Sequence, residues 1–317
     1  MRASVSMAGE GFARLRRQIA EIEGRPQGLG SGDLSVGSDG TGDRAGDGTS
    51  MRIPAGQPAG RPAPARTLSP RRGGTMLPLG VDDLDRRLGG GLRRDGLHEI
   101  RGSVSRDTGA ATGFATGLLA RLARLDGRPV LWVTEETSVR ETGAPYGPGL
   151  DRFGLDSRRL VLVVVRRPED VLWVFEEGLR CTGLAAVLAE LGGHPRQLDL
   201  TASRRLALRA RAHGVTGLLL RSSAEAEPGA ALTRWHVAPL PAGTVDGFDR
   251  GVGRPAWRLD LERNRGGQTG RFDLEWDHER QLFVRAAPPA LSLPGAAAAP
   301  DRPDPAAAGI MAFRRAS

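Results

Sequence analysis

The feature that most restricts the fold is an alternation of strand and helix patterns over about 210 residues, from 76 to 285. Short apolar runs, such as RPVLWVTEE at 128–136 and RLVLVVVRR at 159–167, are typical of buried strands. Between and after them, residues 113–127, 168–183 and 198–214 carry apolar side chains at helical spacing. Repeated units of this kind predict a parallel sheet with helices on both faces.

For two of these helices the sequence also predicts the buried face or the N-terminal cap. The helix at 113–127 is expected to bury one face, which consists of Phe114, Leu118, Leu122 and Leu125. The helix at 198–214 is expected to begin at a cap from Thr201 or Ser203, with Leu206, Leu208 and Ala212 following. Residues 233–240, 255–265 and 270–286 alternate apolar with polar residues instead, which predicts an antiparallel extension at the sheet edge.

The segments outside this core have a different composition. Within residues 1–24, the stretch 9–24 predicts an amphipathic helix whose apolar positions are Phe12, Leu15, Ile19 and Ile22. Residues 25–75 and 286–317 are rich in Gly, Pro, Ser and Ala, which predicts a disordered linker and a disordered tail. The core domain is therefore expected at 76–285. The end of the tail, IMAFRR at 310–315, is either a partner-binding peptide or an irregular terminus.

Composition excludes several kinds of chemistry. All 45 basic residues are arginine, so the chain offers no lysine for a phosphate loop, a Schiff base or a general base. Cys181 is the only cysteine and no two of the five histidines have metal-ligand spacing, so we expect no disulfide, metal or cofactor. The net charge of +8 fits either an acidic partner or GC-rich coding bias. No apolar run suits a membrane span or a signal peptide, so we expect a cytoplasmic protein.

The most informative stretch is LPLGVDDLDRRLGGGLRRDGLHEIRG at 77–102. It resembles the start of the RecA-type ATPase core, and the matching positions are Gly80, Leu84, Asp85, Leu88, Gly89, Gly90, Gly91 and Leu92. The glycines permit a tight reversal after a short helix that Leu84 and Leu88 seat on the core. The resemblance implies an α/β fold, a RecA-like sheet of the P-loop NTPase type with C-terminal antiparallel strands.

The phosphate-binding loop expected after this stretch is degenerate. A working loop has the pattern GxxxxGK followed by Ser or Thr, but here six residues separate Gly102 from Gly109, and Ala110 stands at the lysine position. Losing that lysine forfeits a charge-assisted contact worth roughly 1.5–3 kcal/mol. Arg106 is a nearby cation, but its guanidinium cannot occupy the same compact pocket. The candidate loop residues are Gly102, Ser105, Arg106, Thr108, Gly109, Ala110 and Thr112.

Two further groups match the RecA-type pattern. Glu135 or Glu136 falls where such cores carry the glutamate that activates water, and Glu190 falls at the magnesium-linked position. The alternative is that these carboxylates cap helices or face solvent. Residues 263–265 (Arg263, Asn264 and Arg265) resemble a segment that reaches a neighbouring subunit or partner. The alternative there is a hairpin turn with solvated arginines.

In combination, VLWVTEE, LAAVLAELGG, LDLTASRRL, TRWHVAP, WRLDLERNRGG and FDLEWDHERQ resemble the ImuA family, which is RecA-like and SulA-like. The resemblance covers residues 77–285 and, more weakly, 9–24. It implies a non-catalytic accessory protein of damage-induced translesion DNA synthesis. The implied partners are ImuB, an error-prone C-family polymerase and RecA, with any DNA contact indirect.

Two other functions stay open at this stage. The first is a divergent RecA-type ATPase that binds single-stranded DNA, with Glu135 or Glu136 as the base and Arg263 or Arg265 acting across subunits. The second is a SulA-like inhibitor of cell division. Nucleotide turnover distinguishes the ATPase from the accessory protein, and filamentous growth on overexpression distinguishes the inhibitor.

Overall fold

A computed structural model of the chain describes residues 2–6, 17–22, 24, 75–193, 195–222, 227–242 and 253–286. Nearly all of the predicted core domain is therefore described. The predicted linker after residue 24 lies outside the described residues up to Thr75, as does the predicted tail after Ala286. Among the described residues, no helix combines the length and apolar character needed to cross a bilayer.

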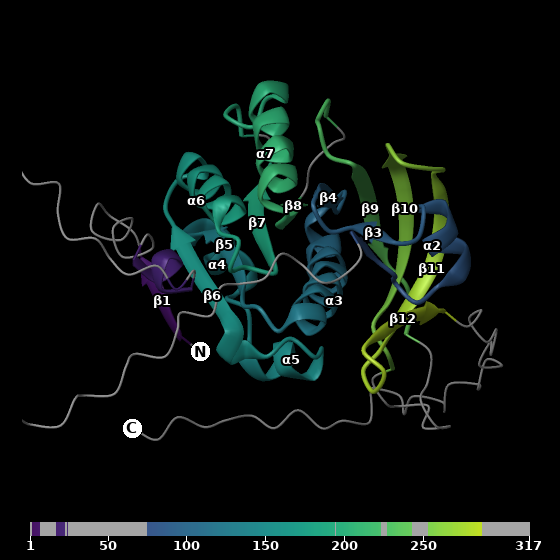
Figure 1. Ribbon diagram of the computed structural model, residues 1–317. Helices are drawn as coiled ribbons and strands as arrows, with labels where there is room; N and C mark the ends of the chain where they lie inside the picture. Colours follow the sequence, from purple (N-terminus) through teal and green to yellow (C-terminus); the bar gives the residue numbers. More distant parts are fainter. Residues whose placement is uncertain are drawn as a thin grey trace, which may run out of the picture.

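Ten strands form one sheet in the order β1-β6-β5-β7-β8-β4-β9-β10-β11-β12. The strands from β1 to β9 in this order pair in parallel, whereas β10, β11 and β12 join antiparallel after β9. Figure 1 shows β12 and its neighbours at one end of the molecule and β1 at the other. Their bounds are β1 Arg2–Ser6, β4 Leu97–Arg101, β5 Val130–Glu135, β6 Leu160–Val165, β7 Ala186–Gly192, β8 Thr216–Ser222, β9 Thr233–Pro239, β10 Ala256–Asn264, β11 Gly270–Asp277 and β12 Leu282–Arg285.

Helices cover the sheet through two separate apolar clusters. Alternate residues of a strand point to opposite faces, so Trp132 of β5 packs with the cluster around α3, and its neighbours Leu131 and Val133 pack with the cluster around α6 and α7. The helix bounds are α2 Asp82–Arg87, α3 Thr108–Asp126, α4 Glu136–Thr142, α5 Gly147–Arg152, α6 Pro168–Arg180 and α7 Leu200–His213. This architecture confirms the predicted α/β fold class, a mainly parallel sheet between helices with antiparallel C-terminal strands.

The glycine-rich stretch forms the predicted reversal after α2. Leu84 and Leu88 are buried, and the carboxylate of Asp85 accepts hydrogen bonds from the backbone N–H groups of Leu79 and Gly80 at 2.7 and 3.0 Å. Gly91 has a φ of 128°, and a Cβ there would lie 2.2 Å from the carbonyl oxygen of Leu77. Only glycine can make this turn, which pairs β2 (Met76–Leu77) with β3 (Leu92–Arg93).

Helix α3 packs against both the parallel and the antiparallel strands of the sheet. Phe114, Leu118 and Leu122 are fully buried, and each contributes about 1.5–3 kcal/mol on removal from water. The ring of Phe114 lies 5.5 Å from Trp235 of β9 and 5.4 Å from Phe283 of β12, measured between centroids. The N-terminal end of α3 is thereby held against both kinds of strand.

Several local expectations were wrong. Leu125, predicted to share the buried face of its helix, is 53% exposed at the last turn of α3. The cap of α7 is Asp199 instead of Thr201 or Ser203, and its carboxylate accepts from the Ala202 N–H at 2.7 Å. Leu208 of α7 is 67% exposed.

Some elements had no counterpart in the prediction. Helices α4 and α5, which follow β5, have fewer than two turns each, too few for an apolar period to show. Strand β1 was also unpredicted; it pairs with β6 and forms one edge of the sheet. Of the predicted N-terminal helix, residues 17–22 are described; they are helical, with Ile19 and Ile22 packed against the α6 and α7 cluster.

Gly117 of α3 provides a test of this packing. An alanine Cβ there would lie 2.8 Å from Cζ of Phe283, whereas nothing lies within 4 Å of a Cβ at Gly109 in the same helix. We expect Gly117→Ala to lower the free energy of unfolding by about 1–3 kcal/mol. Gly109→Ala should leave it unchanged or raise it by up to about 1 kcal/mol. Urea denaturation measures both, and equal effects of the two variants would contradict the packing described.

Candidate functional site

The candidate loop lies between the end of β4 and the start of α3. Gly102 directly follows β4, and its N–H donates to the carbonyl oxygen of Arg221 at 3.2 Å. Ser105 and Arg106 belong to a short 3-10 helix, Ser105–Asp107. Thr108, Gly109, Ala110 and Thr112 lie in the first turns of α3. The structure therefore brings the predicted loop residues together at the carboxyl edge of the sheet, where open α/β sheets bind ligands.

The residue that decides the chemistry of this loop is Asp107, which the sequence reasoning missed. It is 6% exposed at the N-cap position of α3, and its carboxylate accepts from the Val104 N–H at 3.3 Å. A Cβ on Gly102 would lie 2.9 Å from the Asp107 Cβ, so the loop closes tightly on this side chain. A helix N-terminus attracts anions. Here the chain places a buried carboxylate of its own beside the first turn of α3, and this carboxylate accepts from the loop instead of from the helix N–H groups.

These residues do not fit a nucleoside triphosphate. A bound phosphate would meet the Asp107 carboxylate without the lysine that offsets phosphate charge, since Ala110 occupies the equivalent position in α3. The side chain of Arg106 is exposed to solvent. Because like charges repel, a carboxylate beside the start of α3 without a lysine disfavours phosphate at this position of the fold.

The three predicted acidic residues lie at the ends of neighbouring strands but differ in environment. Glu135 ends β5 in a buried position, and burial raises the pKa of its carboxyl, with Glu169 and Glu190 adding to that increase. Glu136 opens α4 and forms ion pairs with Arg140 at 2.7 Å and Arg166 at 3.6 Å. Glu136 is therefore a partly exposed, ion-paired residue, which agrees with the alternative that this carboxylate faces solvent.

Glu190 of β7 has the least ordinary environment of the three. It is 6% exposed, and one carboxylate oxygen accepts from the indole N–H of Trp132 at 3.2 Å. Burial raises the pKa of its carboxyl. The residue lies on the wall of a pocket of about 610 Å³ between the first half of α3, the segment 142–146, α5 and the start of β10. Among the described residues that line this pocket, Glu190 is the only charged one.

The predicted edge residues are engaged within the chain. The Asn264 side chain donates to the carbonyl oxygens of Arg87 and Gln268 at 2.8 and 3.1 Å. Arg263 and Arg265 both donate to the carbonyl oxygen of Gly229, at 2.6 and 3.0 Å. Arg263 and Asn264 end β10 and Arg265 begins the turn that follows, as in the hairpin interpretation, but the arginines hold the segment before β9 instead of being solvated.

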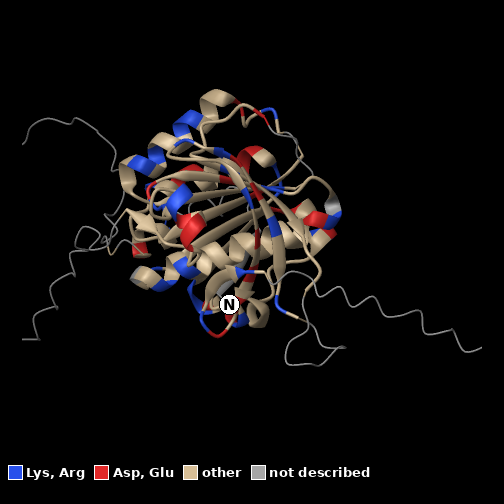
Figure 2. Ribbon diagram, turned by 90° about the vertical axis from the view of Figure 1, so that its right-hand side faces the viewer, with Lys and Arg blue, Asp and Glu red and all other residues tan. Residues whose placement is uncertain are grey.

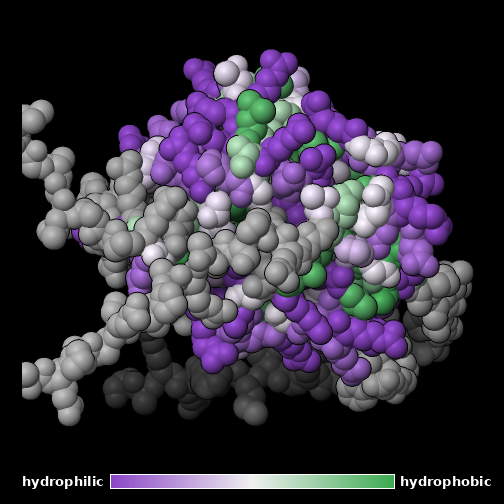
Figure 3. Space-filling view, in the orientation of Figure 1, coloured by the Kyte–Doolittle hydropathy of each residue, from purple (hydrophilic) through white to green (hydrophobic). Residues whose placement is uncertain are grey.

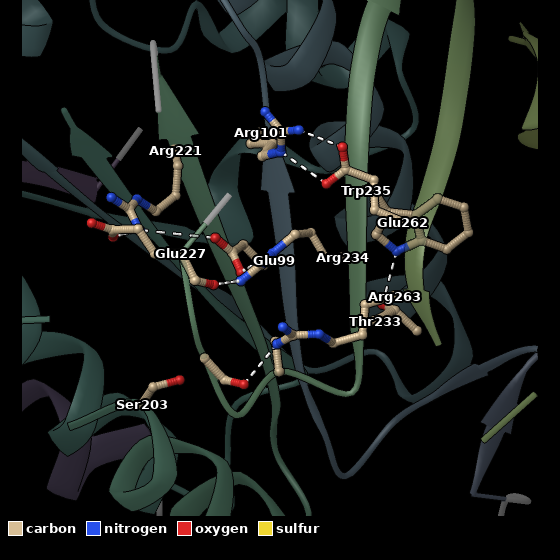
Figure 4. A network of polar contacts seen from close by, with 12 residues as sticks. Glu99, Arg101, Ser203, Arg221, Glu227, Thr233, Arg234, Trp235, Glu262 and Arg263 are labelled. Carbon is tan, nitrogen blue, oxygen red and sulfur yellow. Dashed lines mark hydrogen bonds and ion pairs between the residues drawn. The ribbon is translucent and has the colours of Figure 1, made fainter. Parts of the chain in front are cut away.

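A buried ionic network beside this segment was not predicted. Figure 4 shows Glu99 of β4 between Arg234 of β9 and Arg221 of β8. Nε of Arg234 donates to Glu99 at 2.7 Å, and Arg221 pairs with Glu227 at 3.0 Å. Arg101 also pairs with Glu262 across the sheet. Removing one partner of such a buried pair leaves an uncompensated charge, so the network keeps these strands in register.

The described residues contain no preformed metal site, because no group of three or more His, Cys, Asp or Glu side chains among them could hold a metal ion.

Known proteins similar to this chain agree with the resemblance seen in the sequence. No family model matches the chain. The crystal structure of the RadB recombinase aligns with a TM-score of 0.46 and 15% identity, covering 67% of this chain and 100% of that chain. Two relatives named Protein ImuA come from Caulobacter vibrioides, strains NA1000 / CB15N and ATCC 19089 / CIP 103742 / CB 15. Each is 36% identical over 199 residues, covering 59% of this chain and 77% of the relative. With that identity over more than two thirds of its relatives, the chain belongs to the ImuA family.

Proposed function

We propose that this chain is a non-catalytic, RecA-like accessory protein of damage-induced translesion DNA synthesis, which acts by binding partner proteins. The partners proposed are ImuB, with its error-prone C-family polymerase, and RecA. The observation that carries the non-catalytic part is the loop before α3, where the Asp107 carboxylate is buried and Ala110 replaces the lysine. A core without phosphate chemistry still presents its surfaces to partners.

The outer face of α7 is the surface best suited to such a partner. Ala202, Leu206 and Ala210 bury the inner side of this helix. On the outer side, Leu208 lies one turn from Arg204 and from Arg211, and all three side chains are exposed. An exposed leucine between two cations fits an acidic protein surface that also offers an apolar contact.

The surroundings of this face support the same assignment. Arg205 and Arg209, on the flank of α7, pair with Glu176 of α6 at 2.8 and 3.4 Å. Within the described residues, Arg204 forms no such ion pair with a carboxylate. Figure 3 shows a hydrophobic spot over α7 within hydrophilic surface, and Figure 2 shows arginines recurring along the helices at one side of the sheet. We propose that ImuB docks on this face.

Substituting Leu208 tests the docking face. We expect Leu208→Glu to weaken the complex with purified ImuB by about tenfold or more, because it removes the apolar contact and places an acid before an acidic partner. The matched control is Leu125→Glu, the same change at an exposed leucine of α3. Isothermal titration calorimetry measures both affinities, and circular dichroism checks that both variants fold.

Three outcomes would contradict this assignment. One is the absence of any complex with either ImuB or RecA, which would remove the accessory role itself. Another is equal weakening by Leu208→Glu and Leu125→Glu. The third is binding of single-stranded DNA that falls steeply with salt and is lost in Leu208→Glu, which would assign the face to nucleic acid.

Hydrolysis of ATP distinguishes the accessory protein from the divergent ATPase. We expect the purified chain, with magnesium and single-stranded DNA, to hydrolyse ATP no faster than the Glu135→Gln, Glu136→Gln double variant. The physical reason is that the loop offers phosphate an anion in place of a cation. A phosphate-release assay makes the comparison, and a rate in the unsubstituted chain that exceeds the double variant would favour the ATPase.

A further inference from the structure

The pocket beside α3 is lined mainly by aromatic and apolar groups. Its volume of about 610 Å³ is that of a small-molecule site. Trp132 of β5, Trp257 of β10 and Phe153 contribute to its walls, and Tyr146 lies exposed at its edge. The aromatic contacts of the core fix these walls, since Phe153 stacks on Trp276 at 5.9 Å between centroids.

The polar side chains of this pocket are threonine hydroxyls, which can accept or donate, and one carboxylate, which accepts. Thr108 and Thr112 present hydroxyls from successive turns of α3, and the hydroxyl of Thr116 already donates to the Thr112 carbonyl oxygen at 2.8 Å. Glu190 adds a carboxylate that is 6% exposed and holds one indole N–H. Within the described residues, no cation forms an ion pair with Glu190.

A buried carboxylate without a cationic partner is costly in an apolar setting. The raised pKa of Glu190 expresses that cost, because burial disfavours its charged form. A positively charged ligand group would relieve it, and the faces of Trp132 and Trp257 attract cations as well. A phosphate group would instead meet the Glu190 carboxylate, with no arginine among the described lining residues to offset its charge.

We propose that this pocket binds an organic cation, an amine or guanidinium on an apolar or aromatic body, with the Glu190 carboxylate as its counter-ion. Nitrogen donors of the ligand reach Glu190 and the threonine hydroxyls, and its body packs between the tryptophans. Both a free small molecule and an arginine or lysine side chain of a peptide have this chemistry. The site is separate from the outer face of α7, so it does not depend on how ImuB docks.

Benzamidine is a suitable probe because it joins a guanidinium-like cation to an aromatic ring. We expect saturable binding of one benzamidine per chain, measured by calorimetry and by tryptophan fluorescence. The neutral analogue benzamide should bind at least about tenfold more weakly. Glu190→Gln, which keeps the shape of the side chain but removes its charge, should weaken benzamidine binding by about the same factor.

Glu136→Gln is the matched control. It neutralises a carboxyl at the start of α4, directly after the adjacent strand, and that residue does not line the pocket. Benzamidine should bind this variant as it binds the unsubstituted chain. Thermal unfolding of both variants checks that each is folded before the titration.

Displacement of benzamidine distinguishes the two sources of the cation. Stronger displacement by a Phe-Arg dipeptide amide than by agmatine assigns the site to a peptide side chain, and the reverse assigns it to a free amine. The proposal is overturned if benzamidine fails to bind at about 10 mM. It is equally overturned if benzamide binds as well as benzamidine, or if Glu190→Gln leaves the affinity unchanged.

Discussion

The rest of this structure depends on the packing of the Phe114 ring against the aromatic side chains of the C-terminal strands. Its ring centroid lies 5.5 Å from Trp235, 6.2 Å from Trp257 and 5.4 Å from Phe283. Gly117, one turn along, allows α3 to approach Phe283 closely. The cluster ties the helix to strands that follow it by more than a hundred residues. It thereby fixes both the loop before α3 and the wall of the pocket beside it.

The loop that this contact positions carries the wrong charge for a nucleotide. The chain has 45 arginines, yet Arg106 of the loop is exposed to solvent and several arginines at the strand ends are used within the fold. Arg234 and Arg221 serve the buried Glu99, and Arg263 and Arg265 bind the Gly229 carbonyl oxygen. The buried carboxylates of Asp107 and Glu190 remain at the places where phosphate and magnesium chemistry would need cations or metal. This edge of the sheet is therefore suited to recognition instead of phosphate chemistry.

Much of the fold could be predicted because its signals are local. The run VLWVTEE indicated a buried strand, and the three glycines after Leu88 indicated the reversal that their positive φ angles confirm.

The site was less predictable because its decisive features depend on contacts far apart in sequence. Nothing in the sequence around Glu99 shows that its partner is Arg234, 135 residues later. Asp107 looked like an ordinary loop residue, and its cap position and proximity to Gly102 could have revealed it only once the start of α3 was known. Leu125 was predicted to share the buried face because helical spacing identifies an apolar residue but not where along the helix the burial ends.

The central claim is that the loop before α3 is closed to triphosphates by its own carboxylate. An equilibrium titration of fluorescently labelled ATP with magnesium, read by fluorescence anisotropy, tests this most directly. The account predicts an anisotropy that stays at the value of free nucleotide up to about 1 mM protein. A saturable curve with one site per chain, competed by unlabelled ATP, would contradict it.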